Sequence, residues 1–166
     1  MTHFEQQRHK PVTPLLSPRQ LVLACVAMRS NVNISAIART ASVCGVRRLI
    51  LSGNAKLINK IARDGADQLD VEVHRSLPPV LRSYRTSGYR LVGLEQATNA
   101  QNIHTYRFKR RTLLVIGNER LGLSEDVLAE LDDVIEIPVY GLPHSFNAAT
   151  AAAMALYEFC RQFGSS

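Results

Sequence analysis

Side chains able to hold a phosphate or to orient a reactant gather in three short segments of the chain. They are Asn33 and Arg39 in the first segment, Glu119 in the second, and Ser145 and Asn147 in the third. An arginine stays protonated in proteins and presents a planar fork of donors, so Arg39 is suited to clamping a phosphate group. Each segment alone also has a structural explanation, because Asn and Ser commonly cap helices and glycine-containing loops commonly form turns.

The second and third segments each follow an apolar run of strand length. Leu113–Ile116 leads into Gly117–Leu123, and Val134–Val139 leads into the loop before Ser145. Open α/β sheets bind small molecules just beyond the carboxyl ends of their strands. We therefore expect these two loops to form walls of one ligand crevice.

Strand-length apolar runs alternate with helix patterns along the whole chain. Strands are expected over Leu21–Met28, Arg47–Leu51, Val71–His74, Tyr89–Leu94, Leu113–Ile116 and Val134–Val139. Helices are expected over Ile34–Cys44, Leu57–Asp64, Leu77–Ser87, Ser124–Leu131 and Ser145–Phe163. Asn33 is the expected cap of the first helix, and the polar stretch Ala97–Thr105 is expected to be a loop. This alternation predicts an α/β fold with a mainly parallel six-stranded sheet and helices on both faces.

The composition predicts how the chain is divided into domains and where the protein is located. Its 166 residues, 46% of them hydrophobic, predict one domain over 19–166, after an irregular arm over 1–18 that contains three prolines. Three separated cysteines without a Cys-x-x-Cys pair predict reduced thiols and a cytoplasmic protein. No apolar run is long enough to cross a bilayer, and no His/Cys set has metal-ligand spacing, so neither a membrane nor a metal is expected.

Several common α/β enzyme motifs are missing. The turn after the first expected strand reads Arg-Ser-Asn-Val-Asn-Ile-Ser in place of Gly-x-Gly-x-x-Gly, which argues against a nicotinamide-dependent enzyme. Neither a Walker A lysine motif nor a Gly-x-Ser-x-Gly nucleophile elbow occurs.

The order and spacing of the three segments resemble the SpoU (TrmH) family of SPOUT methyltransferases, which transfer a methyl group from S-adenosylmethionine to RNA. That family shows Asn-x-Gly/Ser-Ala-x-x-Arg-Thr-Ala, then Gly-x-Glu-x-x-Gly-Leu, then Ile-Pro-Met-x-Gly-x-x-x-Ser-Leu-Asn. The matching stretches here are Asn33–Ala41, Gly117–Leu123 and Ile137–Asn147. Val139 replaces the usual Met and Phe146 the usual Leu, and neither change removes a group expected to do chemistry.

The resemblance implies a fold, a cofactor and a reaction. It implies a SPOUT fold with a C-terminal trefoil knot, a homodimer, and methylation of a ribose 2′-hydroxyl in tRNA or rRNA. By motif position, the catalytic residues would be Arg39, Asn33, Glu119, Ser145 and Asn147. The residues that bind S-adenosylmethionine would be Leu94, Gly117, Gly122, Ile137 and Phe146.

Each catalytic residue has an expected role. Arg39 would hold the target phosphate and orient the 2′-hydroxyl, with partial base character. Ser145 and Asn147 would position Arg39 or the ribose. Asn33 would hold the first loop, and Glu119 would accept a hydrogen bond from the nucleotide or brace Arg39. In a dimer, Arg39 of one subunit is expected to act beside the cofactor of the other.

The charge distribution predicts contact with RNA. The formal net charge is +6 and the isoelectric point is near 9.6, which favours a polyanionic partner. The expected phosphate contacts are Arg107, Lys109, Arg110 and Arg111. The aromatic residues near them either stack on bases or belong to the core; they are Tyr84, Tyr89, Tyr106 and Phe108.

Two other functions compete with ribose methylation. One is methylation of a base nitrogen on the same fold, and the other is a non-catalytic RNA-binding module. The retained Asn33, Arg39, Glu119, Ser145 and Asn147 argue against the module. Product analysis separates the two methylation reactions, because a 2′-O-methyl group blocks alkaline cleavage of the adjacent phosphodiester.

Overall fold

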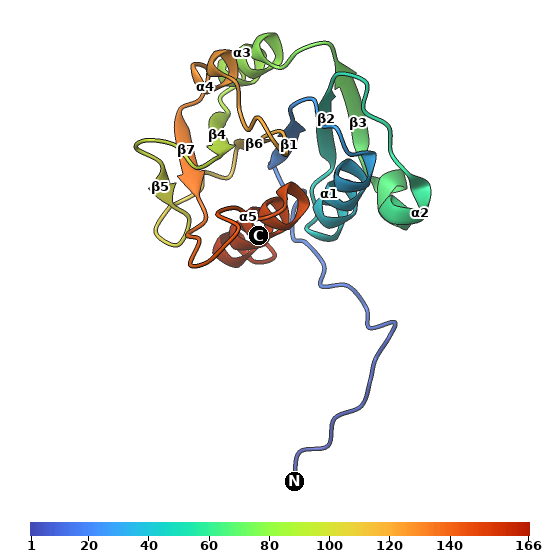
Figure 1. Ribbon diagram of the computed structural model, residues 1–166. Helices are drawn as coiled ribbons and strands as arrows, with labels where there is room; N and C mark the ends of the chain where they lie inside the picture. The colour runs from blue at the N-terminus through green and yellow to red at the C-terminus, as the bar shows by residue number, and fades with distance from the viewer.

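Seven strands form one sheet in which every neighbouring pair is parallel (Figure 1). The computed structural model describes residues 1–166. The strands are β1 (Val22–Cys25), β2 (Arg48–Ser52), β3 (Asp70–His74), β4 (Arg90–Leu94), β5 (Gln101–Asn102), β6 (Thr112–Ile116) and β7 (Asp133–Glu136). Their spatial order is β3-β2-β1-β6-β4-β7-β5, so β1, β6 and β4 lie in the middle. The parallel α/β architecture predicted from the sequence is confirmed.

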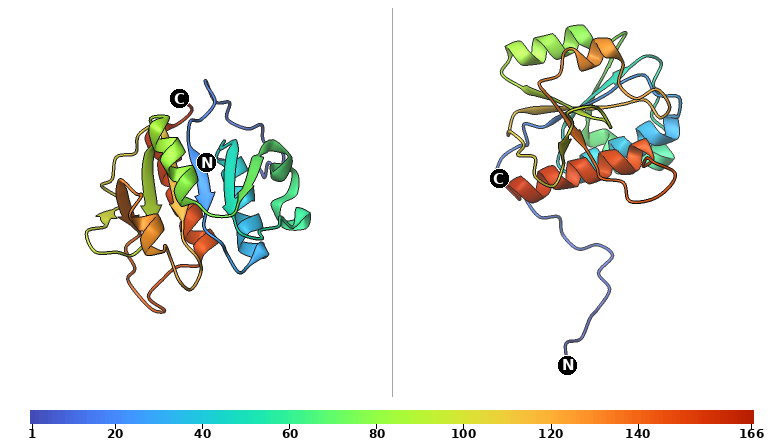
Figure 2. Two further views of the ribbon diagram at one scale, coloured as in Figure 1. Left: turned by 90° about the horizontal axis from the view of Figure 1, so that it is seen from above. Right: turned by 60° about the vertical axis from the view of Figure 1, so that its left-hand side comes forward.

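Helices cover both faces of the sheet, as Figure 2 shows. They are α1 (Asn31–Val43), α2 (Asn59–Ala62), the 3-10 helix η1 (Arg63–Gln68), α3 (Pro78–Thr86), α4 (Glu125–Leu128) and α5 (Ala148–Phe163). Along β1, Leu23 and Cys25 point toward α1 and α5, whereas Val22 and Ala24 belong to the core beneath α3 and α4. Successive strand residues face opposite sides, so a strand buried on both faces is continuously apolar.

The sheet has one strand more than the predicted six. The extra strand β5 lies within the expected loop Ala97–Thr105 and pairs with Ile135 and Glu136 of β7. Its two residues are polar and exposed at the sheet edge, so no apolar run announces it. The last predicted strand is also shorter than expected, because β7 ends at Glu136 and Ile137 begins a loop.

Two helices begin at residues other than those predicted. Ser30, not Asn33, caps α1, and its hydroxyl accepts a hydrogen bond from the Asn33 N–H at 3.2 Å. Helix α5 begins after Asn147, whose Oδ1 accepts from the N–H groups of Ala149 and Thr150, so Ser145 lies in the preceding loop. In both places Ser and Asn stand close together, and either side chain is a good cap.

One predicted helix is divided in two. The expected helix over 57–64 is instead the short α2 followed by η1, whose first residue, Arg63, has a positive φ of 53°. The expected trefoil knot concerns how the chain threads its own loops, which strand order and register do not describe, and it stays a prediction.

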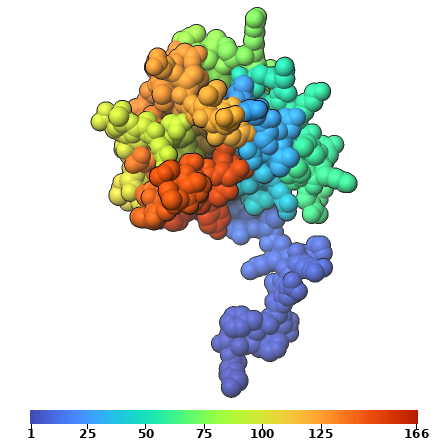
Figure 3. Space-filling view, viewed as in Figure 1, coloured from blue at the N-terminus to red at the C-terminus, as the bar shows by residue number.

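Residues 1–18 contain no helix or strand and extend away from the body (Figure 3). The end of this arm joins the domain where the N–H of Leu16 donates to the carbonyl of Ser165 at 2.8 Å. No helix combines the length and the apolarity that crossing a membrane requires.

Candidate active site

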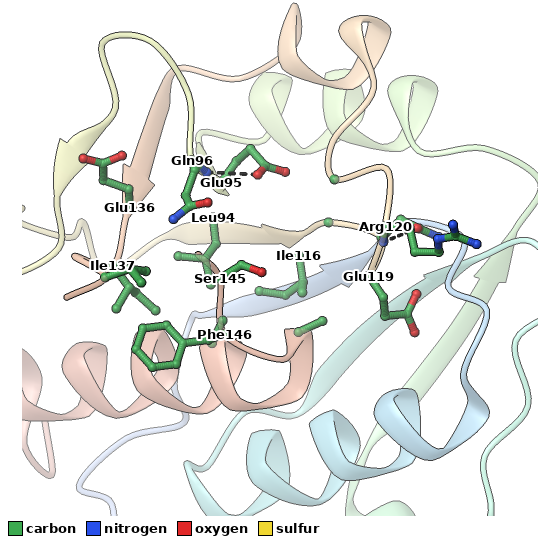
Figure 4. A pocket seen from close by; sticks show the side chains of 16 residues that line it. Leu94, Glu95, Gln96, Ile116, Glu119, Arg120, Glu136, Ile137, Ser145 and Phe146 are labelled. Carbon is green, nitrogen blue, oxygen red and sulfur yellow. Dashed lines mark hydrogen bonds between the residues drawn. The ribbon is translucent and has the colours of Figure 1, made fainter. Parts of the chain in front are cut away.

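A pocket of about 260 Å³ opens where β4, β6 and β7 end (Figure 4). Its apolar wall includes the last residues of β4 and β6, Leu94 and Ile116, together with Ile137 just after β7. Phe146 and the first turn of α5 close the opposite side. The carboxyl ends of parallel strands meet at one edge of a sheet, which is why segments distant in sequence form one crevice.

The rim of the pocket is polar and includes three acidic side chains. Glu95, Glu119 and Glu136 line it together with Arg120 and Ser145. A slot with an apolar wall and a rim of carboxylates suits a ligand that joins a flat aromatic ring to positively charged groups. S-adenosylmethionine, with an adenine, a sulfonium and an ammonium group, has this chemistry. No group of three or more His, Cys, Asp or Glu side chains is arranged to hold a metal ion.

All five residues expected to bind the cofactor line this one pocket. They are Leu94, Gly117, Gly122, Ile137 and Phe146. The structure adds Glu95, which the sequence reasoning missed. Glu95 is the first polar residue after β4, and the rule that ligands bind beyond strand ends would have singled it out.

The glycines of the second segment are needed for packing against Glu95. Asn118 and Gly122 exchange two backbone hydrogen bonds of 3.0 Å, which closes a tight turn. Oε2 of Glu95 accepts from the N–H of Leu123 at 2.9 Å. A Cβ at Gly122 would overlap the Glu95 carboxylate, and the φ of Gly122 is +65°. A Cβ at Gly117 would lie 2.9 Å from the carbonyl carbon of Gly122.

Replacing Gly122 with alanine is therefore expected to destabilise the protein by about 1–3 kcal/mol, through its left-handed backbone and the overlap with Glu95. Urea unfolding measures the change. Gly141→Ala is the matched control, because no atom lies within 4 Å of a Cβ built there. Equal losses for both variants would contradict the packing role of Gly122.

One hydrogen-bonded network joins all three sequence segments. The carboxylate of Glu119 accepts from the backbone N–H groups of Arg29 and Ser30 and from Nδ2 of Asn33, each at 3.1 Å. Nδ2 of Asn147 in turn donates to Oδ1 of Asn33 at 3.2 Å. These hydrogen bonds join residues that are 86 and 114 positions apart in the sequence, and they hold the loop between β1 and α1 against the pocket.

Within one chain Glu119 braces this loop and makes no hydrogen bond or ion pair with Arg39, so its expected role toward Arg39 stays a prediction. Partial burial alone would raise the pKa of the Glu119 carboxyl. Hydrogen bonds from its own N–H, from Arg29 and Ser30, and from the Asn33 amide more than offset this, and the pKa lies below its ordinary value. The carboxylate form is the one that the four donors stabilise.

Arg39 lies outside the pocket of its own chain. It is exposed on α1, and its guanidinium makes no hydrogen bond or ion pair with another residue. It follows Asn33 by six positions, which places it about 9 Å further along the helix axis. Helical spacing puts it on the same outer face as Val32 and Val43, which are 53% and 82% exposed.

Ser145 lines the pocket from the loop before α5. Nε2 of Gln96 donates to the carbonyl of His144 at 2.9 Å and fixes this loop beside β4. Neither Ser145 nor Asn147 contacts Arg39 within one chain, so the structure gathers four of the five expected catalytic residues at one edge and leaves Arg39 apart.

The expected RNA-binding residues lie at the opposite end of the sheet. Arg107, Lys109, Arg110 and Arg111 are all exposed, and they precede β6, whereas the pocket lies beyond its last residue. Tyr106, just before these basic residues, and Phe108, between Arg107 and Lys109, are only 6% and 5% exposed. The alternative that these two rings stack on bases is therefore wrong, and they belong to the core.

Comparison with known proteins finds an RNA methyltransferase family and relatives named as tRNA methyltransferases. Residues 20–157 match the model of the SpoU rRNA Methylase family. The tRNA (guanosine(18)-2′-O)-methyltransferase of Escherichia coli K12 is 28% identical over 160 residues, which cover 93% of this chain and 70% of that protein. A mouse protein with the same activity in its name is 26% identical over 86% of this chain, but the chain spans only 9% of the mouse protein's length.

Solved structures agree with the family match. The Aquifex aeolicus TrmH/SpoU tRNA modifying enzyme superposes with a TM-score of 0.82 at 27% identity, covering 87% of this chain and 75% of that one. The SpoU methyltransferase AviRb of Streptomyces viridochromogenes, solved with its cofactor AdoMet, has a TM-score of 0.73 at 29% identity, covering 89% of this chain and 59% of that one. Two of the three motif segments line the pocket, and the first adjoins it where Asn33 donates to Glu119. This chain belongs to the SpoU rRNA Methylase family.

Proposed function

We propose that this protein transfers a methyl group from S-adenosylmethionine to a ribose 2′-hydroxyl of tRNA. The observation that carries the proposal is the single pocket beyond β4, β6 and β7, where Glu119, Ser145 and the five expected cofactor residues meet. The names of the E. coli and mouse relatives support tRNA as the substrate.

The residues of the pocket would divide the work of binding. Leu94, Ile137 and Phe146 would enclose the adenine, and the carboxylate of Glu136, which makes no hydrogen bond or ion pair within the chain, would attract the positive groups. When bound, S-adenosylmethionine supplies a methyl group already activated by the positive sulfonium. The protein has to place the 2′-oxygen in line with that methyl and assist the loss of a proton from a weakly acidic hydroxyl.

We propose a homodimer in which each active site is built by two subunits. Helices α1 and α5 pack side by side on one face of the sheet (Figures 1 and 2). The outer sides of these helices expose Val32, Val43, Met154 and Tyr157, by 53%, 82%, 38% and 73%. An exposed apolar stripe of this kind is typical of a subunit interface. Arg39 lies in the same stripe, so pairing of two copies would carry it toward the partner's pocket.

The direct test is methyl transfer from labelled S-adenosylmethionine into total RNA, followed by separation of tRNA from rRNA and mapping of the product. We expect label in tRNA, at a nucleotide whose 3′ phosphodiester resists alkaline cleavage. Label at an alkali-sensitive position would instead favour a base methyltransferase. Absence of both transfer and S-adenosylmethionine binding would favour a non-catalytic RNA-binding module.

A further inference from the structure

A second cleft, of about 450 Å³, lies at the opposite end of the sheet from the candidate active site. It is formed by the residues that precede or begin β1, β2, β4 and β6 and by the C-terminal end of α5. Four arginines line it: Arg19, Arg47, Arg48 and Arg110. None of its thirteen lining residues is an aspartate or a glutamate.

Aromatic rings hold the guanidinium groups in place. The guanidinium carbon of Arg19 lies 5.9 Å from the ring centre of Phe159, and that of Arg110 lies 5.0 Å from the ring centre of Phe163. At the margin, Arg111 covers Tyr89 at 5.0 Å in the same way. Because arginines cover these ring faces, the rings orient donors and are not free to stack on a base.

The arginines that line this cleft do not use all their donors within the chain. Nε and Nη2 of Arg19 donate to the carbonyls of Cys44 and Gly164, but its Nη1 is buried without a partner. A buried unpaired donor on a charged group is costly. Arg47 is exposed and makes no side-chain hydrogen bond or ion pair. Arg48 donates to the hydroxyl of Tyr84 at 3.1 Å, and its ion pairs with Asp70 and Glu72 are long, at 3.8 Å and 3.9 Å, and weak.

We propose that this cleft binds an internal phosphodiester of the RNA substrate. The inference rests on the proposed function, because it takes the ligand to be RNA. Fixed arginine forks match phosphate oxygens, and covered rings leave no surface for reading a base, so the contact is independent of sequence. The exposed Arg107, Lys109 and Arg111 extend the positive charge away from the cleft along the segment before β6.

The test compares two double variants that remove equal charge. Arg47→Gln with Arg110→Gln changes the cleft, and Lys60→Gln with Arg75→Gln changes exposed cations elsewhere that have no ion-pair partner. Binding of unmodified tRNA is measured by fluorescence anisotropy between 50 and 200 mM salt, a range chosen because phosphate contacts make affinity salt-dependent. We expect the cleft variant to bind on the order of tenfold more weakly, with a salt slope smaller by about 1 to 2, and the control to change little.

Further measurements distinguish a folding defect, a failure of the cleft proposal and a failure of the proposed function. Arg47→Glu alone removes no internal contact, so its weaker binding at an unchanged melting temperature would support the cleft without a folding artefact. Both cleft variants should bind S-adenosylmethionine as the wild type does. If wild-type protein binds tRNA but the cleft and control variants lose equal affinity, the cleft proposal is overturned while the proposed function stands. If the wild type neither binds tRNA nor transfers methyl groups, the proposed function itself fails.

The source of the phosphate is tested with one RNA in two forms. The cleft should bind RNA bearing a 5′-monophosphate and the same RNA after dephosphorylation equally well. A preference of tenfold or more for the 5′-phosphate that disappears in the Arg47→Glu variant would overturn the assignment to an internal phosphodiester, and would make the ligand a phosphate monoester.

Discussion

Replacing Arg39 with alanine is expected to abolish methyl transfer while S-adenosylmethionine binding survives. Arg39 lies outside the pocket of its own chain and contributes no internal hydrogen bond, so its loss should leave the fold and the cofactor site intact. Losing a group that orients the nucleophile and stabilises charge typically lowers the rate by about 10²- to 10⁴-fold. Single-turnover methyl transfer measures the rate, and calorimetry measures cofactor binding.

Two variants sharpen this expectation. Arg75→Ala removes another exposed arginine without an ion pair and should transfer methyl groups at the wild-type rate. Arg39→Lys keeps the charge but loses the planar fork, so it should recover only part of the rate if the fork orients the substrate. Near-normal turnover of Arg39→Ala would remove Arg39 from the reaction.

Replacing Glu119 with glutamine is expected to lower both stability and cofactor affinity. The N–H groups of Arg29 and Ser30 and the Asn33 amide all donate to the carboxylate, and glutamine would offer one acceptor and turn donors of its own toward them. Donors left unpaired in a partly buried site cost about 1–3 kcal/mol in the free energy of unfolding, toward the lower end where water reaches them. Urea unfolding at pH 7 measures this loss.

The pH dependence of that loss has a definite sign. The pKa of Glu119 lies below its ordinary value of 4.5 in the folded state, so the native state favours the carboxylate. The stabilisation is therefore fully present above about pH 4.5 and disappears as the pH falls through the lower folded-state pKa. The stability difference between wild type and Glu119→Gln should shrink below that pH. Glu125→Gln, at an exposed carboxylate in α4, should show neither the loss at pH 7 nor the acid dependence.

Periodicity in the sequence predicted the parallel sheet and its two covered faces because the central strands are buried on both sides and continuously apolar. It missed β5, since a two-residue polar edge strand forms only because Ile135 and Glu136 of β7 offer free backbone groups beside it. The helix starts were misplaced because Ser30 and Asn33, or Ser145 and Asn147, are equally good caps in sequence. Only the packing of the loop selects one of each pair.

The sequence predicted which residues form the site but not which of them contact one another. Motif order singled out Asn33, Glu119 and Asn147, yet the role of Glu119 as the brace of a loop depends on β1 and β6 lying next to each other in the sheet. The need for glycine at position 122 depends in the same way on Glu95 reaching across from the neighbouring strand β4. Such long-range neighbours follow from strand order, which local sequence does not specify.

A mixed-dimer experiment tests most directly whether two subunits build each active site. One chain carries Arg39→Ala with an intact pocket, and the other carries Ala148→Trp, which fills the pocket but keeps Arg39. Each variant alone should be inactive, and calorimetry should show that Ala148→Trp no longer binds S-adenosylmethionine. After the chains are unfolded and refolded together, half of the dimers are mixed and half of their sites are complete, so about a quarter of wild-type activity should return. No recovery in dimers shown to be mixed would contradict a site shared between subunits.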